Sequence, residues 1–533
     1  MGNLKAAMEG YMKVLNGDPQ NADALYYVAV VAVQEGQYAE GIKLAERALA
    51  FGPQQARLHN LIGQTYLRLG QPQEALASYD RAIELQPDFA DAHGNRANVL
   101  VIFGYSNEAL AAFDRALAIR PTSHEDWTNR GALLQDLDRI EDALASYERA
   151  IALRPQFAGA HYNRGNALRE LGQIADAAAS RGGTDAGQHD AAEVAYSKAI
   201  ELDPKLADAF LGRAILRLMR GNWQAGWRDY EYRASVGKPT FVPLEHPRWQ
   251  GEPPNDARLV LVAEQGLGDA IFFGRFGPLL ATRGYDVTIL TRPSMRTLLS
   301  SLAGVTIATS SKELAKDPRP IRWLPLMSVA GALGTTPATV PADVPYLSAQ
   351  PERIAAWAQR LGSVGFKIGI NWASGHQIDH AFIRRSILLS DFAPLAALPG
   401  VRLISLQKGP PTDQIMGADF RKRILMLDTD PDPSADLFLD TAAVMTQLDL
   451  IITCDTSVAH LAGALARPVF TALPMVADWR WLLGRDDSPW YPTMRLFRQT
   501  KRGEWSDVFA RITQAVRIMI ADKSAPSPPT VIH

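Results

Sequence analysis

Five prolines recur at one fixed spacing in the first half of the chain. They stand 34 residues apart, at Pro19, Pro53, Pro87, Pro121 and Pro155. Proline often follows a helix end, and self-similarity with a period of roughly 20–50 residues is the signature of a solenoid. In a solenoid each unit packs only on its neighbours. The spacing therefore predicts a stack of helical units here rather than one globular core.

Other residue types keep the phase of the prolines. Glycine recurs where a first helix should end, and small residues recur in the second helix beside an aromatic residue. Small residues let two helices approach closely, and the aromatic ring fills the groove beside them. The positions in phase are Gly36, Gly70, Gly104, Asp138 and Gly172 at the turn, Gly41, Ala75, Ala109, Ala143 and Ala177 at the second helix start, the aromatic residues Tyr79, Phe113 and Tyr147, and Ala48, Ala82, Ala116 and Ala150 after them.

This pattern resembles the tetratricopeptide repeat (TPR), and we expect a TPR solenoid over residues 1–233. The next proline in phase, Pro204, follows after 49 residues, so the fifth unit holds 15 extra residues. They fall near residues 180–191, which are polar and glycine-rich, and we expect a loop that interrupts the second helix. The units begin at Ala22, Ala56, Ala90, His124 and Ala158, with a degenerate sixth from Ala207.

The first helices of such an array line a concave, groove-like face. An Asn-Arg pair recurs on them, and its side chains can hydrogen-bond an extended peptide backbone without reading its sequence. We therefore expect a protein or peptide partner in the groove, and the alternative is a merely solvated repeat face. The candidate groove residues are Asn95, Asn129, Arg130, Asn163 and Arg164.

A dense group of aromatic residues follows the sixth unit. Trp223, Trp227, Tyr230 and Tyr232 fall on one short helical stretch, and we expect them to cover the end of the solenoid. The alternative is stacking against a ligand. Residues 234–257 hold five prolines and show no period, which indicates a semi-rigid connector.

The second half alternates short apolar runs with helical patterns in two series, over residues 258–347 and 348–522. Alternation of this kind predicts two Rossmann-like domains with parallel sheets. In the first, a strand at 258–263 is followed by EQGLGD. Gly266 and Gly268 allow the backbone to approach a ligand. Asp269 stands near a helix N-terminus, where it either caps the helix or accepts a proton from a hydroxyl group.

In the second series, an apolar strand at 448–454 ends in Asp455-Thr456-Ser457, and a helix of small residues follows at 458–466. Ligands bind at the carboxyl edge of open α/β sheets, and free N–H groups at a helix start bind anions. Asp455, Thr456 and Ser457 are therefore candidates for binding a diphosphate. His460 lies one turn further on and faces the same side, unless it is a buried structural histidine.

Three cations and an aromatic segment complete the candidate site. Arg384, Arg385 and Lys408 lie in loops after strands and can bind phosphate, or they are solvated charges. Asp478, Trp479 and Trp481 either wall a pocket or pack against nearby aromatic residues. The pair His376 and His380 allows a metal site, but a loop over the substrate is the favoured interpretation, and we expect no metal.

The segments EQGLGDAIFF, RRS, LQKG, DTSVAHLAGAL and DWRWLLGRDDSPWYPTMRLFRQ together resemble bacterial TPR glycosyltransferase-like proteins. Their second half is similar to the heptosyltransferases of glycosyltransferase family 9, which have the GT-B fold, and the architecture is loosely similar to that of O-GlcNAc transferase. The resemblance implies that Asp269 acts as a base and that the segment from Asp455 to His460 holds the donor diphosphate. The chain departs from the family at Ser457, where glycine is usual, and at Glu264-Gln265, where a basic residue is usual. ADP-heptose is therefore not implied as the donor.

These features together predict a TPR solenoid followed by a GT-B-like pair of Rossmann-like domains. The expected function is transfer of a sugar from a nucleotide-diphospho-sugar to an acceptor that the repeats recruit, without a cofactor. Asp269 would deprotonate the acceptor, and Arg384, Arg385 and His460 would offset the charge of the leaving group. The main alternative is a non-catalytic adaptor with a degenerate transferase half. A nucleotide-sugar hydrolase or epimerase is a third, although the Gly-x-Gly-x-x-Gly motif of a dinucleotide-dependent epimerase is missing.

Composition narrows the compartment and the class of partner. The net charge of −2 offers no global field for nucleic acid, and the single cysteine, Cys454, fits a reducing compartment. No apolar run reaches about 18 residues, so we expect no membrane span. The start of the chain shows no signal-peptide pattern, and we expect a cytoplasmic protein with a disordered tail at residues 523–533.

Overall fold

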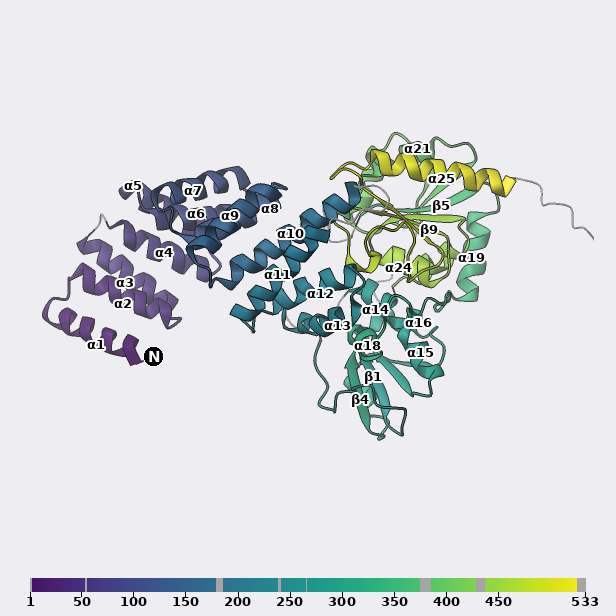
Figure 1. Cartoon of the computed structure of the whole chain (residues 1–533), viewed down its shortest axis with the longest axis horizontal. Coiled ribbons are helices and arrows are strands. Elements are labelled where there is room, and N and C mark those ends of the chain that lie inside the picture. The colour runs from purple at the N-terminus through teal and green to yellow at the C-terminus, as the bar shows by residue number, and fades with distance from the viewer. Residues whose placement is uncertain are drawn as a thin grey trace, which may run out of the picture. The chain divides into compact units, whose positions relative to one another are not determined.

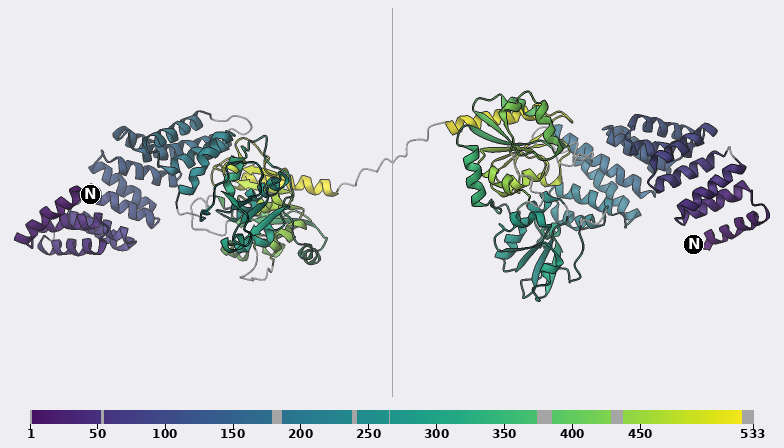
Figure 2. Two further views of the ribbon diagram at one scale, coloured as in Figure 1. Left: turned by 90° about the horizontal axis from the view of Figure 1, so that it is seen from below. Right: turned by 180° about the vertical axis from the view of Figure 1, so that it is seen from behind.

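The structure, a computed structural model, describes residues 2–52, 55–178, 186–237, 241–264, 266–373, 385–427 and 437–524. The chain divides into two compact units. The first holds Met1–Leu168 and Val194–Leu206, and the second holds Arg169–Glu193 and Ala207–His533. Figures 1 and 2 show the helices and strands of both units.

The first unit is a stack of antiparallel helix pairs. Its first helices begin at each of the residues that the repeat predicts, which confirms the phase of the units. The helices are α1 (Gly2–Gly17), α2 (Ala22–Gln34), α3 (Tyr38–Phe51), α4 (Ala56–Arg68), α5 (Pro72–Leu85), α6 (Ala90–Ile102), α7 (Ser106–Ile119), α8 (His124–Asp136), α9 (Ile140–Leu153), and parts of α10 (Ala158–Ala178) and α11 (Ala186–Leu202).

A small residue of the first helix faces an aromatic ring of the second helix in successive pairs. A Cβ atom on Gly63 would lie 2.7 Å from the Tyr79 ring, and one on Gly131 would lie 2.5 Å from the Tyr147 ring. The third unit uses a different combination, Ala97 with Phe113, in one buried cluster. The close approach of the two helices thus depends on the absence of a side chain at positions 63 and 131.

The turns between paired helices use left-handed backbone. Gly36, Gly70 and Gly104 have φ angles of 80°, 74° and 77°, and Asp138 takes the same position with a φ of 63°. Glycine adopts this conformation without a steric cost, which explains its recurrence at the end of the first helix.

The fifth unit departs from the prediction. Gly172 does not end a helix, because it lies inside α10, which runs for 21 residues where the other first helices have 13. The extra residues lengthen both helices of the unit, since residues 186–191 belong to α11. Within the second unit, Gln173 near the end of α10 donates a hydrogen bond from its Nε2 to the Ala477 carbonyl. The longer helix therefore contacts the segment around Ala477. Residues 179–185 lie outside the described part.

The second unit contains two parallel sheets with helices on their faces. The first sheet has the strand order β3-β2-β1-β4, and the second has the order β10-β9-β8-β5-β6-β7. The strands are β1 (Arg258–Val262), β2 (Val287–Leu290), β3 (Val305–Ala308), β4 (Ile321–Pro325), β5 (Phe366–Asn371), β6 (Val401–Ser405), β7 (Ile424–Leu425), β8 (Leu450–Cys454), β9 (Val469–Leu473) and β10 (Met494–Arg498). The predicted strands are confirmed with small shifts, and β10 is a strand that the sequence reasoning missed.

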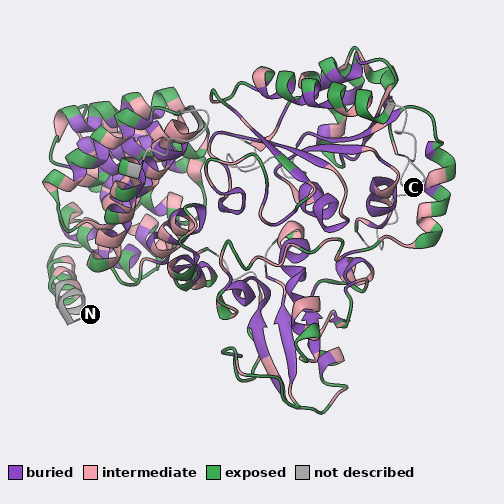
Figure 3. Cartoon of the chain, turned by 45° about the vertical axis from the view of Figure 1, so that its right-hand side comes forward, coloured by how far each residue is buried: buried purple, intermediate pink, exposed green. Residues whose placement is uncertain are grey.

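Helices and short helical turns cover these sheets. Figure 3 shows the strands of both sheets as buried, with exposed residues on the outer helix faces. The elements are α12 (Ala207–Met219), α13 (Trp223–Tyr230), η1 (Glu231–Ser235), α14 (Leu267–Gly274), α15 (Phe276–Thr282), η2 (Pro293–Met295), α16 (Arg296–Leu299), α17 (Ser311–Leu314), η3 (Leu326–Ser328), α18 (Val329–Ala332), α19 (Pro351–Leu361), η4 (Leu389–Phe392), α21 (Ala393–Ala396), η5 (Pro410–Asp413), α22 (Gln414–Gly417), η6 (Arg421–Arg423), α23 (Leu439–Thr446), α24 (Ser457–Ala464), η7 (Trp479–Trp481) and α25 (Ser506–Ser524).

Each sheet has a switch point, where consecutive strands depart in opposite directions and ligands bind beyond the carboxyl ends. In the first sheet it lies between β1 and β4, and in the second between β5 and β8.

The segments outside the sheets are short. Trp249 of the connector is buried, and its N–H donates to the Trp323 carbonyl at β4. The sequence predicts a tail at residues 523–533, but residues 523 and 524 belong to the end of α25. Residues 525–533 lie outside the described part. No helix in the described ranges is long and apolar enough to cross a membrane.

The contact between Gly131 and Tyr147 gives a test of the repeat packing. Gly131→Ala places a methyl group against the Tyr147 ring, and overpacking of this kind costs about 1–3 kcal/mol. We expect a lower thermal midpoint by far-UV circular dichroism. Adding Tyr147→Phe recreates the Ala97 and Phe113 combination and should restore part of the loss. An unchanged midpoint for the single variant would contradict the close approach.

Candidate functional site

The first turns of two sheet-linked helices meet in the second unit. α14 follows β1 and α24 follows β8, and a Cβ atom on Gly268 would lie 3.4 Å from Ser457 Cα and 3.3 Å from His460 Cδ2. Glycine at position 268 therefore allows this contact. The structure brings together the Gly-Asp loop and the Asp-Thr-Ser turn, which are far apart in the sequence.

Asp269 has donors at both carboxyl oxygens. Its Oδ2 accepts from the Gly266 N–H at 3.1 Å, which caps α14, and its Oδ1 lies 2.5 Å from Arg480 Nη2. Arg480 also pairs with Asp478 at 2.9 Å. Burial lowers the pKa of Arg480, but the two carboxylates outweigh it and raise the pKa, so this cation stays charged. The helix-cap alternative for Asp269 is thus observed, together with an ion pair that the sequence did not predict.

His460 is buried among aromatic rings. It stacks on Trp481 at a centroid distance of 5.5 Å, and its Nδ1 shares a hydrogen bond of 3.2 Å with the Tyr491 hydroxyl. Burial, followed by the charges of Arg480 and Arg275, holds the pKa of His460 well below its usual value. The imidazole is therefore neutral near pH 7. The burial agrees with the alternative of a buried structural histidine, and a neutral ring can still offer an N–H to a ligand.

Asp455 carries a buried carboxyl group at the start of α24. Its side chain is 6% exposed, and Arg385 Nη1 lies 3.8 Å from its Oδ2. Burial and the charge of Asp478 raise the pKa of Asp455 to about 6, against the opposing effect of Arg385. Among the described residues, Arg385 is the ion-pair partner of Asp455, and the distance between them is long. The Asp455 carboxyl group can therefore accept a hydrogen bond from a bound hydroxyl group.

A polar network lies at the switch point of the second sheet. Asn371 ends β5, and its Oδ1 accepts from Thr456 Oγ1 at 2.9 Å and from Thr453 Oγ1 at 3.1 Å. Its Nδ2 donates to Gln407 Oε1 at 2.8 Å. Sequence reasoning missed Asn371, Thr453 and Gln407, although a polar residue at the end of an apolar strand was the signal. The Thr456 hydroxyl therefore already has a hydrogen-bond partner within the protein.

The switch point of the first sheet is filled by a side chain from the helical segment. Arg233 of η1 donates from Nη2 to Glu264 Oε1 at 2.7 Å and from Nε to Oε2 at 3.1 Å. Ser328 and the Met327 N–H, which follow β4, complete the contact. Both charged side chains are almost fully buried. Glu264 therefore binds Arg233 in the folded chain.

Aromatic residues join the helical segment to the 479–491 segment. Trp223 stacks on Trp490 at 5.0 Å, and Trp227 meets Trp479 edge-on at 5.3 Å. The predicted covering residues thus pack against the α/β body within the second unit. Trp479 and Trp481 are buried and contact other rings, which agrees with the packing alternative. Asp478 is engaged by Arg480.

The groove candidates of the first unit mostly bind their neighbours. Asn95 donates to Asn60 at 2.9 Å, and Asn129 donates to Asn98 at 3.3 Å. Arg130 pairs with Asp114 at 2.7 Å, and Arg164 pairs with Glu148 at 3.6 Å. Asn163 is partly buried on α10. The Asn-Arg pattern therefore ties each of these first helices to preceding helices.

Two predicted cations have other outcomes. Lys408 directly follows Gln407, whose Nε2 donates to the Lys408 carbonyl, so its backbone belongs to the switch-point network. Arg384 lies outside the described residues, as do His376 and His380.

Comparison with known proteins identifies the repeats. Residues 20–88, 60–124 and 184–206 match tetratricopeptide repeat profiles, and residues 135–172 match a profile described as TPR repeat. The first half thus carries TPR repeats, as the sequence pattern predicts. Protein FlbA of Caulobacter vibrioides is 27% identical over 358 residues, which are 62% of this chain and 59% of that protein. The chain therefore spans under two thirds of that relative.

Solved structures resemble the chain over about one third of its length. The MamA protein has a TM-score of 0.29 and 20% identity, over 36% of this chain and 95% of that chain. YrrB, described as a TPR protein with an unusual peptide-binding site, has a TM-score of 0.29 and 22% identity, over 36% of this chain and 91% of that chain. A thermophilic TPR protein of Thermus thermophilus has a TM-score of 0.29 and 23% identity, over 31% of this chain and 91% of that chain.

The buried pair of Arg233 and Glu264 gives a first prediction for this site. Arg233→Met leaves a buried carboxylate without its cation, and breaking such a pair costs about 3–5 kcal/mol. We expect this loss in urea denaturation followed by tryptophan fluorescence, which reports the second unit because Trp127 alone lies outside it. Arg233→Met with Glu264→Met should lose less than the single variant. Arg248→Met, at a more exposed pair, is the control and should cost under about 1 kcal/mol.

Asp455 gives a second prediction, on pH dependence. Its pKa is raised on folding, so its charged form destabilises the fold above pH 6, and protonation relieves this cost as the pH falls. Asp455→Asn should therefore stabilise the protein at pH 7.5 by on the order of 1–2 kcal/mol, and the gain should shrink below pH 6. The same fluorescence measurement applies, with the exposed Asp419→Asn as control. A loss of stability at pH 7.5 would show instead that the carboxylate holds the turn.

Proposed function

We propose that the chain is a GT-B-type glycosyltransferase that moves a sugar from a nucleotide-diphospho-sugar to an acceptor recruited by the TPR repeats. One observation carries the proposal. The Asp-Thr-Ser turn, the start of α24 and the Arg385 side chain coincide with the switch point of the six-stranded sheet. Sheets of this type bind ligands at that place.

The donor would be held by the first turn of α24. The backbone N–H groups of Ser457 and Val458 have no partner inside the helix, because the first turn of any helix leaves them unpaired. They suit a diphosphate, and the guanidinium of Arg385 can bind a phosphate oxygen pair. Asp455, 3.8 Å from that guanidinium, would accept from a hydroxyl group of the sugar. The buried carboxyl group thus has a use that explains its cost.

Asp269 is the proposed base. The acceptor O–H would give its proton to Asp269, the acceptor oxygen would bond to the anomeric carbon, and the bond from that carbon to the diphosphate would break with its electron pair. The Asp269 carboxylate is oriented by Arg480 and by the Gly266 N–H. The neutral His460 would donate an N–H toward the leaving group, since it cannot offer a positive charge.

The TPR repeats support a protein or peptide partner. Repeat arrays of this kind present extended binding surfaces. In the described residues of the first unit, the paired Asn and Arg side chains are held in fixed positions by their neighbours. We therefore propose that a partner forms hydrogen bonds with the donors and acceptors of these side chains that their neighbours leave open. The acceptor of the sugar is this partner or a molecule bound to it.

Donor binding gives the first test. We expect at least one of the UDP, GDP or ADP sugars to raise the thermal midpoint of the full chain. Arg385→Gln should weaken that donor at least about tenfold, which corresponds to about 1.4 kcal/mol. The exposed Arg421→Gln is the matched control and should bind as the natural chain does. If none of these donors stabilises the protein, the transferase proposal fails.

The role of Asp269 gives the second test. With the donor found, Asp269→Asn should cut nucleotide release in the presence of acceptor by about 10²–10⁴-fold, because general bases contribute this much. Donor affinity should stay within a few-fold. Since Asp269 also caps α14, the thermal midpoint of the variant must be measured beside its rate. Equal losses in rate and donor affinity would assign Asp269 a structural role only.

A non-catalytic adaptor is the second candidate. The ion pair between Asp269 and Arg480 favours it, because both carboxyl oxygens already have donors. The donor panel distinguishes the two functions, since an adaptor has no need to bind any nucleotide sugar.

A further inference from the structure

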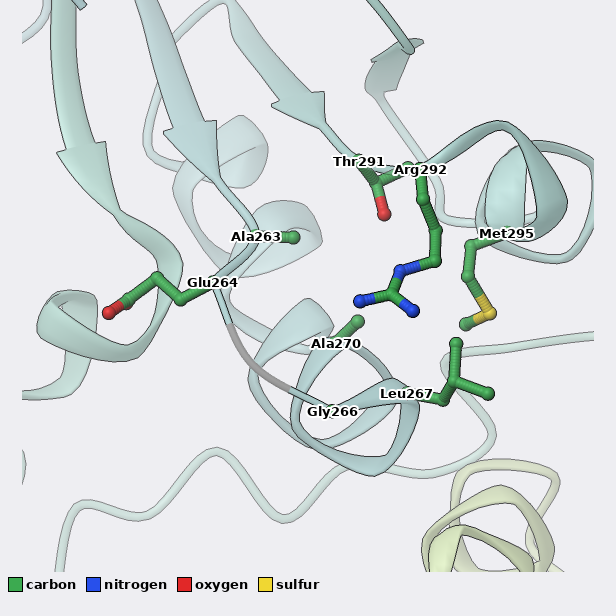
Figure 4. A pocket seen from close by; sticks show the side chains of 8 residues that line it. All are labelled: Ala263, Glu264, Gly266, Leu267, Ala270, Thr291, Arg292 and Met295. Carbon is green, nitrogen blue, oxygen red and sulfur yellow. The ribbon is translucent and has the colours of Figure 1, made fainter. Parts of the chain in front are cut away.

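A second candidate ligand site lies on the four-stranded sheet, away from its switch point. A pocket of about 170 Å³ opens between the carboxyl ends of β1 and β2 and the first turn of α14. Its lining residues are Ala263, Glu264, Gly266, Leu267, Ala270, Thr291, Arg292 and Met295 (Figure 4). At about 30 Å³ per liquid water, the volume corresponds to roughly five or six waters, enough for a small anionic group.

The polar groups of this pocket come from the two residues after β2. Figure 4 shows the Arg292 guanidinium reaching toward Ala270 and the end of β1, with the Thr291 hydroxyl turned to the same space. Thr291 is 7% exposed, and its side chain lines the pocket. A hydroxyl group at this place can donate one hydrogen bond and accept others. The two side chains therefore present several donors to the same space.

The charges around the pocket favour an anion. The Glu264 carboxylate turns away from Arg292 in Figure 4 and is paired with Arg233. Asp269, the acidic residue in the first turn of α14, is paired with Arg480. Among the described lining residues Arg292 carries a positive charge, and the adjacent start of α14 adds the positive end of a helix dipole.

The opposite wall of the pocket is apolar. Leu267, Ala270 and Met295 lie beside the guanidinium, so a ligand can place an organic group against them while its anionic group meets Arg292. Guanidinium binds phosphate oxygens in a fork, and a hydroxyl group can donate to a third oxygen. In dinucleotide-binding sheets with the order 3-2-1-4, an arginine near the second strand accommodates a ribose phosphate. The four-stranded sheet has this order.

We propose that this pocket binds a phosphate group, carried as a monoester, through Arg292 and Thr291. The organic part of the ester lies against Leu267 and Met295. The site is separate from the proposed donor site at α24, so it stands or falls independently of the transferase proposal.

Titration calorimetry on the full chain tests the site with two probes, inorganic phosphate and phenyl phosphate. We expect phenyl phosphate to bind, and Arg292→Gln to weaken it at least about tenfold, or about 1.4 kcal/mol. Arg292→Lys keeps the charge and loses the fork, so its affinity for phenyl phosphate should lie between those of the unsubstituted chain and Arg292→Gln. Thr291→Val should also weaken binding. Binding should strengthen from pH 5 to pH 7.5, because the second ionisation of a phosphate monoester has a pKa of about 6.

The controls separate this site from general charge effects. Arg283→Gln removes an exposed cation of the same domain and should leave binding unchanged. Tighter binding of phenyl phosphate than of inorganic phosphate assigns the site to an ester, and equal binding assigns it to free phosphate. Absence of binding by both probes overturns the proposal. Binding that Arg292→Gln and Arg283→Gln weaken equally, in variants with natural thermal midpoints, overturns it as well.

Discussion

The fork between Arg233 and Glu264 sets the arrangement of the first sheet. Two charges are buried together at the switch point of β1 and β4, where such a sheet would otherwise receive a ligand. Neither charge can be buried alone at a tolerable cost, so the helical segment that carries Arg233 must stay against the sheet. A pocket lies on the other side of β1, where Thr291 and Arg292 line it together with the start of α14.

The switch point of the second sheet is lined by different side chains. No arginine fork from the helical segment fills it in the described ranges, and the small polar side chains of Asn371, Thr453 and Thr456 line the strand ends. Beside them lies Asp455, whose raised pKa reports a buried charge that the fold does not fully compensate. Natural proteins keep such unfavourable groups mainly at functional sites. The contrast between the two sheets is therefore the physical reason for placing the donor on the second one.

The sequence predicted what depends on local pattern. The helix starts of the repeats, the left-handed turns at Gly36, Gly70 and Gly104, and most strands follow from periodicity and turn chemistry. It also placed the Gly-Asp loop and the Asp-Thr-Ser turn at strand ends. It could not predict the pair of Asp269 and Arg480, which are 211 residues apart, or the longer α10, because these depend on contacts that exist only in the folded chain. For the same reason it left open whether Trp479 and Trp481 line a pocket or pack.

These long-range contacts converge on the first turn of α14. Arg233 holds the loop before it through Glu264, and Arg480 holds its third residue, Asp269. Arg480 lies in η7, which packs on α12. Just before η7, the Ala477 carbonyl accepts a hydrogen bond from Gln173 of α10. Under the proposed function, the base is therefore controlled by the segment that borders the donor site, because Arg480 binds Asp269 and Asp478 with one guanidinium. Any shift of Arg480 would therefore also change the position of the Asp269 carboxylate, because the same guanidinium holds both carboxylates.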